Sequence, residues 1–126
     1  MSRHRTARRL LVVLALAGLA TACGGDDDVA EGPADPVTEL TITSPDTSFD
    51  IEHFKVPAGE EITITYANED DGISHNWNLK GVDGAKTELE RGSNEQTVSF
   101  TIDDPGEYEY VCDVHPVQMK GTVDAV

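Results

Sequence analysis

Cysteine, basic residues and long apolar runs are scarce in this chain of 126 residues. Two cysteines, Cys23 and Cys112, allow at most one disulfide, which excludes a disulfide-rich scaffold. The longest apolar run, residues 10–20, is shorter than the roughly 20 residues that cross a bilayer. Four of the 9 basic residues precede Cys23 and all 24 acids follow it, so the part after Cys23 carries a net charge of −19. This acidity argues against a nucleic-acid partner and favours basic proteins, or it serves only to keep the protein soluble.

The first residues have the pattern of an export signal. A basic start, a short apolar core and small residues predict a secretory signal peptide over residues 1–22. The motif "LATAC" at residues 19–23 resembles the lipobox of bacterial lipoproteins, which implies cleavage before Cys23 and attachment of lipid, such as palmitate, to it. The expected protein is extracytoplasmic and anchored to the cell membrane. A free secreted protein with a disulfide between Cys23 and Cys112 is the alternative, and Arg8-Arg9 also permits twin-arginine export.

An acidic stretch follows the lipobox. Residues 24–36 contain five acids, three glycines and two prolines, and they lack aromatic side chains. Such a composition buries too little apolar surface to offset the entropy of ordering, so residues 23–36 are predicted to be the lipidated cysteine and a disordered tether. Residues 37–126 remain for one folded domain.

The folded part alternates between apolar and polar residues with the period of strands. This pattern predicts an all-β protein, an antiparallel Greek-key sandwich or barrel. A change of phase near His53 suggests a bulge, and residues 84–94 form a loop with at most one helical turn. Tyr108, Tyr110 and Cys112 share one face, so the cysteine should point inward. The predicted strands are residues 39–43, 48–56, 61–67, 74–81, 96–102, 108–112 and 120–126.

The stretch "YVCDVHPVQMKG" places Cys112, His115 and Met119 within eight residues. A mononuclear copper site for electron transfer uses two imidazoles, one thiolate and a weak axial sulfur, so one imidazole is missing from this stretch. His75, which follows a polar loop, and His53, inside a predicted strand, are the candidates. The end of a strand favours His75, because loops meet at the ends of a sandwich.

Several motifs resemble those of the cupredoxins, the small blue-copper proteins that include plastocyanin, pseudoazurin and amicyanin. They are "FKVPAGEEITITYANED", "SHN" in mid-domain, "PGEYEYVC", and "C-x-x-H-P" followed by "M-x-G" before the last strand. The likeness covers roughly residues 38–126. It implies one type 1 copper ion per chain, with ligands at His75, Cys112, His115 and Met119.

The resemblance also assigns residues around the ligands. Asn76 matches the asparagine that ties the two ligand loops together and helps to orient the thiolate. Three residues separate His115 from Met119, and a spacing of two would place Gln118 at the axial position instead. Trp77, Tyr108 and Tyr110 are expected to be packing residues.

A filled set of protein ligands predicts an electron carrier and not an enzyme, because metal catalysis needs an open position. Electrons are expected to pass at His115, within an apolar patch that contains Val114, Pro116 and Val117. A monomer with basic redox partners is expected, such as c-type cytochromes or a terminal oxidase. Two alternatives stay open. The chain could store or deliver copper, or it could be a copper oxidase or nitrite-reducing enzyme, which would need further metals.

Overall fold

The structure is a computed structural model, and it describes residues 29–126. The predicted signal peptide, Cys23 and the first part of the predicted tether lie outside the described residues. None of the described residues forms a helix that is long and apolar enough to span a membrane. The strands within residues 29–126 are β1 (Glu39–Ser44), β2 (His53–Val56), β3 (Glu61–Asn68), β4 (Ser74–His75), β5 (Asn78–Leu79), β6 (Glu90–Arg91), β7 (Asn94–Thr101), β8 (Gly106–Val111) and β9 (Lys120–Ala125).

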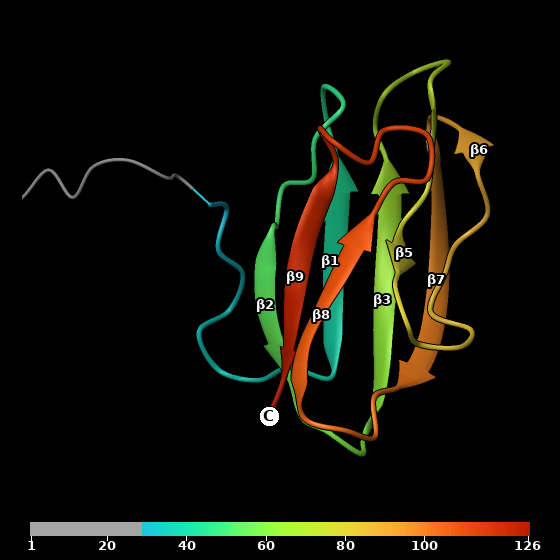
Figure 1. Cartoon of the computed structure of the whole chain (residues 1–126). Helices are drawn as coiled ribbons and strands as arrows, with labels where there is room; N and C mark the ends of the chain where they lie inside the picture. The colour runs from blue at the N-terminus through green and yellow to red at the C-terminus, as the bar shows by residue number, and fades with distance from the viewer. Residues whose placement is uncertain (1–28) are drawn as a thin grey trace, which may run out of the picture.

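Two sheets pack face to face, which confirms the predicted all-β sandwich (Figure 1). One sheet has the strand order β1-β3-β7, the other has the order β2-β9-β8-β5, and β4 pairs with β6 at one side. The pairs β1–β3 and β2–β9 are parallel, whereas the sequence predicted antiparallel strands throughout. The reason is that the chain crosses to the other sheet after β1, so strands that are not joined by a hairpin become neighbours.

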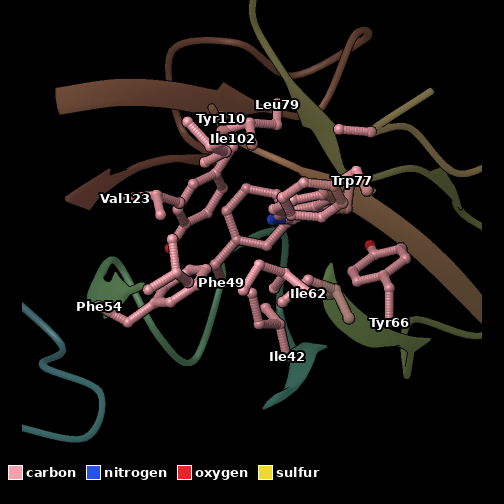
Figure 2. Packing of buried hydrophobic residues seen from close by; sticks show 14 of the residues in the cluster. Ile42, Phe49, Phe54, Ile62, Tyr66, Trp77, Leu79, Ile102, Tyr110 and Val123 are labelled. Carbon is pink, nitrogen blue, oxygen red and sulfur yellow. The ribbon is translucent and has the colours of Figure 1, made fainter. Parts of the chain in front are cut away.

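The core lies between the sheets and follows the period of two. Along β3, Ile62, Ile64 and Tyr66 are fully buried, while the residues between them face outward. Figure 2 shows that the large side chains of both sheets point toward one another. Trp77 stacks on Phe100 with ring centroids 5.7 Å apart, which confirms the expectation that it packs in the core. Burial of each large apolar side chain contributes about 1.5–3 kcal/mol to stability.

The predicted strand at residues 48–56 is shorter in the structure, because its first half is part of a loop. Of residues 48–56, only β2 is a strand, and residues 45–52 form a loop. Asp46 and Thr47, just before the predicted strand, have φ values of 51° and 54°, in the left-handed region of a turn. After this turn the Ser48 N–H donates to the Pro45 carbonyl (3.2 Å) and the Asp50 N–H donates to the Thr43 carbonyl (3.0 Å), so these residues bond back to the end of β1 and its loop. The phase change near His53 therefore marks the start of the strand and not a bulge within it.

The predicted strand at residues 74–81 divides between two partners. β4 pairs with β6, and β5 pairs with β8 in the larger sheet. The predicted loop at residues 84–94 contains the short strand β6 and no helical turn. His75 and Leu79 are nevertheless both buried, as the alternating pattern predicted. The division matters for function, because it places His75 at the edge of the sandwich, next to the loops.

Three connections meet at the upper end of the sandwich in Figure 1. They follow β1, β3 and β8, and they contain residues 45–52, 69–73 and 112–119. β1 and β3 are parallel, so both end on this side. Topology thus brings residues from three distant parts of the sequence to one place.

Part of the predicted tether packs against the domain. The Glu52 N–H donates to the Ala30 carbonyl (2.7 Å), and the Gly32 N–H donates to the His53 carbonyl (2.7 Å). The Val37 N–H donates to the Lys55 carbonyl (2.9 Å). This segment therefore covers the free edge of β2, where the sequence predicted disorder. The composition of the segment gave no sign of it, because backbone groups make most of these contacts.

His53 fastens this segment with its side chain. One ring nitrogen lies 2.8 Å from Glu31 Oε2 and the other lies 2.9 Å from Asp124 Oδ2. The hydrogen bonds to Glu31 and then to Asp124 raise the pKa of His53 above its ordinary value of 6.5. The protonated imidazole can donate to both carboxylates at once, whereas the neutral ring can donate to only one.

The attachment of the N-terminal segment is therefore expected to weaken as pH rises. A raised pKa means that the stabilisation is complete below about 6.5 and is lost as pH rises through the higher value in the folded state. Amide exchange at Gly32, corrected for the intrinsic rate, should accelerate up to about fivefold between about pH 6 and pH 9. Glu31→Gln should flatten this dependence and Glu39→Gln, on the other sheet, should not. Identical profiles for the two variants would contradict the role of His53.

Candidate metal centre

His75, Cys112 and His115 converge at the upper end of the sandwich. The Cys112 sulfur lies 3.8 Å from Nδ1 of His75 and 3.8 Å from Nδ1 of His115. The two Nδ1 atoms are 3.1 Å apart. Among the described residues this is the only group of three or more potential metal ligands from histidine, cysteine and carboxylate side chains. The structure therefore brings together the two histidines and the cysteine that the sequence singled out.

The spacing of these donors fits a metal ion. A metal about 2.0–2.1 Å from each nitrogen and about 2.3 Å from the sulfur, in a trigonal plane, sets sulfur and nitrogen about 3.8 Å apart and the two nitrogens about 3.6 Å apart. The observed sulfur–nitrogen distances of 3.8 Å agree with this, and the nitrogens at 3.1 Å are slightly closer. Two imidazoles and one thiolate in a trigonal arrangement are the donor set of type 1 copper.

Met119 returns to the site through a short, hydrogen-bonded loop. The His115 N–H donates to the Cys112 carbonyl (3.2 Å), and the Met119 N–H donates to the His115 carbonyl (2.9 Å). The Cys112 N–H then donates to the Met119 carbonyl (3.0 Å), which closes the loop. The Met119 side chain is fully buried, whereas Gln118 is exposed. This burial favours Met119 over Gln118 as an axial donor.

Asn76 joins the two ligand segments. Its Oδ1 accepts a hydrogen bond from the Asp113 N–H (2.9 Å), and its Nδ2 donates to the Asp113 carboxylate (2.9 Å). Asp113 follows Cys112 directly, so these bonds hold the backbone that carries the thiolate next to the segment that carries His75. The tie expected from the resemblance is therefore present.

Asp70 is a component of the site that the sequence did not indicate. Its Oδ2 lies 2.7 Å from Nε2 of His75. That nitrogen donates its proton to the carboxylate, and Nδ1 is left with a lone pair directed at the metal position. The backbone N–H groups of Asp46 (2.6 Å) and Thr47 (2.7 Å) also donate to Asp70. In the sequence, Asp70 is one of three successive acids in a polar loop, and nothing distinguishes it from its neighbours.

The electrostatics of Asp70 follow from these bonds. Burial acts to raise the pKa of this carboxyl. The hydrogen bonds from Thr47, His75 and Asp46 outweigh it, so the pKa lies below the ordinary value. Asp70 is therefore ionised at neutral pH, and its hydrogen bond to Nε2 holds the His75 ring in one orientation.

The glycine of the "M-x-G" motif has a steric role. Tyr110 packs beneath the ligand loop, and its hydroxyl donates to the Ile51 carbonyl (2.5 Å). A Cβ atom at Gly121 would overlap the ring and the hydroxyl of Tyr110. Only glycine lets β9 pass this close to the aromatic core, which sets the path of the chain directly after Met119.

The other candidate histidine lies outside the site. His53 is in β2, where its ring is held between two carboxylates, and it is not part of the donor group. The choice of His75 over His53 is thus supported by position.

Comparison with known proteins agrees with this geometry. A family model described as a cupredoxin-like domain matches residues 10–124. The chain belongs to the cupredoxin family. This cupredoxin is 32% identical over 106 residues to amicyanin-alpha of Methylorubrum extorquens, which covers 82% of this chain and 83% of the relative.

Solved structures show the same fold. Dithionite-reduced auracyanin from Roseiflexus castenholzii matches with a TM-score of 0.67 and 23% identity, over 73% of this cupredoxin and 99% of that chain. Auracyanin A from Chloroflexus aurantiacus, which is described as a "blue" copper protein, matches with a TM-score of 0.60 and 23% identity. That match covers 73% of this cupredoxin and 100% of the other chain. At these identities the two structures establish the fold.

The burial of Met119 generates a prediction for the copper-loaded protein. Met119→Leu should still bind copper, but its reduction potential should rise, because loss of a sulfur donor disfavours Cu(II) more than Cu(I). A tenfold change in the one-electron equilibrium corresponds to about 59 mV, and we expect at least that shift. Gln118→Ala should leave the potential unchanged in the same voltammetric measurement. The opposite result, a shift only in Gln118→Ala, would make the glutamine the axial group.

Proposed function

We propose that this cupredoxin carries single electrons by means of one type 1 copper ion per chain. His75, Cys112 and His115 supply the strong donors, and Met119 supplies the weak axial sulfur. The observation that carries the proposal is the convergence of two imidazoles and a thiolate at distances that suit a trigonal metal. Bound copper supplies a one-electron change between Cu(I) and Cu(II).

The arrangement of the ligands suits an electron carrier. The chain holds the donors close to their metal-binding positions through Asp70, Asn76 and the hydrogen-bonded ligand loop. Ligands that are fixed in this way need little rearrangement when the charge of the metal changes. The protein donors would also fill the inner positions, and metal catalysis generally requires an open one. These features support a carrier and not an enzyme.

His115 provides the route for electrons. It is only partly buried, whereas His75 and Cys112 are completely buried. Val114 is 49% exposed and Val117 is 77% exposed on either side of it. A partner that docks on this apolar patch comes close to the imidazole edge without crossing polar groups. The net charge of −19 after Cys23 supports a basic redox partner, such as a c-type cytochrome or a terminal oxidase, and association that slows at high salt.

The optical spectrum of the copper-loaded chain tests the proposal. Wild type should show the intense visible absorption of thiolate-to-Cu(II) charge transfer, with about one copper per chain. Cys112→Ser should lose this band entirely, because a hydroxyl replaces the thiolate. His53→Gln, which removes a histidine outside the site, should keep the band. A Cys112→Ser variant that remained coloured would disprove the assignment. Copper transfer to a chelator faster than electron self-exchange would favour copper delivery over electron transport.

We also propose that the chain is exported and anchored at the cell membrane through lipid on Cys23. The support is the lipobox-like motif alone, since Cys23 lies outside the described residues. Wild type should incorporate labelled palmitate and sediment with membranes, and Cys23→Ser should do neither. Cys112→Ser removes the other cysteine and should behave as wild type in this assay. Membrane association that persists in Cys23→Ser would overturn the anchor.

A further inference from the structure

The carboxylate of Asp113 gathers four side-chain nitrogen donors beside the ligand loop. Asn78 Nδ2 lies 2.7 Å from it, Asn76 Nδ2 lies at 2.9 Å, Lys86 Nζ at 2.7 Å and Lys80 Nζ at 3.5 Å. The side chain of Asp113 is 29% exposed, and the Asp113 N–H donates to Oδ1 of Asn76. None of the other acids in the described part of the chain accepts hydrogen bonds from so many side chains.

The ladder between β5 and β8 produces this convergence. Asn78 is opposite Val111 in the register, so Asn76 lies opposite Asp113 where the ladder continues. Side chains alternate along a strand, so Asn76, Asn78 and Lys80 share the face toward Asp113. Trp77 and Leu79 point into the core instead.

Lys86 comes from the other side of β5. Its segment pairs with the strand through the bridge between Asn78 and Lys86, and the Leu79 N–H donates to the Ala85 carbonyl (2.9 Å). The lysine therefore reaches across β5 to the ligand loop. The loop between β5 and β6 is in this way connected to the residue that follows the thiolate.

Two lysines face the Asp113 carboxylate, although the protein as a whole is strongly acidic. Only 5 of the 9 basic residues follow Cys23, and two of them are placed on Asp113. Lys86 Nζ lies 2.7 Å and Lys80 Nζ 3.5 Å from the carboxylate oxygens, so two ammonium groups offset its negative charge locally.

We infer that Asp113 is a positioning residue for the metal centre and that Lys86 and Lys80 cancel its charge. The carboxylate holds the Cys112 segment against β5, and the lysines prevent that negative charge from stabilising the oxidised metal. This inference rests on the proposed copper site. It predicts opposite effects of the two partners, since Coulomb coupling acts on the reduction equilibrium with the sign of the charge removed.

Reduction potentials of the copper-loaded full chain test the charge effect. Lys86→Met should lower the equilibrium constant for reduction of Cu(II) to Cu(I) about three- to tenfold. Asp113→Asn should raise the same constant by a similar factor. The double variant should return close to the wild-type value, because the two substitutions remove opposite charges from nearly the same place. Lys55→Met, in β2, makes the same change in charge away from the site. Equal shifts for Lys86→Met and Lys55→Met, or shifts of the same sign for Lys86→Met and Asp113→Asn, would overturn the inference.

Amide exchange in the metal-free chain tests the positioning effect separately. Asp113→Ala should accelerate exchange at the His115 and Met119 amides several-fold, while Asp113→Asn, which can still accept hydrogen bonds, should retain part of the protection. Unchanged exchange in Asp113→Ala would show that the carboxylate does not hold the loop. If the wild-type chain bound no copper, the proposed function would fail while this measurement still decided the positioning role.

Discussion

Complete burial of His75 is the constraint on which the metal centre depends. A buried imidazole needs a partner for each ring nitrogen inside the protein. Nε2 finds Asp70 at 2.7 Å, and Nδ1 faces Cys112 and His115. Asp70 is in turn partnered by the Asp46 and Thr47 N–H groups, whose left-handed backbone directs both toward the carboxylate. The loop after β1 thus orients a ligand that it does not contain.

The sandwich beneath the site is a rigid platform for the remaining donors. The β5–β8 ladder runs directly into the contact between Asn76 and Asp113, so strand register sets the relation between the two ligand segments. Tyr110 in β8 packs against Trp77, just before β5, with ring centroids 5.5 Å apart, so a side-chain contact is added to the backbone pairing. Close packing of this kind resists small displacements. The proposed electron transport requires ligand positions that stay nearly the same in the Cu(I) and Cu(II) states.

Acidic residues fall into two groups in this protein. A few are bound to specific partners: Asp70 to His75, Asp113 to two lysines and two asparagines, and Asp124 to His53. The larger number face solvent and produce a long-range negative field that is screened by salt. In the arrangement that we infer, acids near the copper centre are neutralised or hydrogen-bonded. The remaining surface charge would then steer partners without disturbing the metal potential.

The amino-acid pattern alone determined the all-β class and most of the strands, because a period of two is a local property of successive residues. It also identified Cys112, His115 and Met119, which lie close together in the chain, and it favoured His75. The structure added what depends on distant contacts. These are the parallel strand pairs, the seating of residues 30–37 on β2, and the roles of Asp70 and of the lysines at Asp113. These features depend on contacts between residues that are far apart in the sequence. The sequence of a polar loop does not indicate which of its carboxylates will contact a buried imidazole.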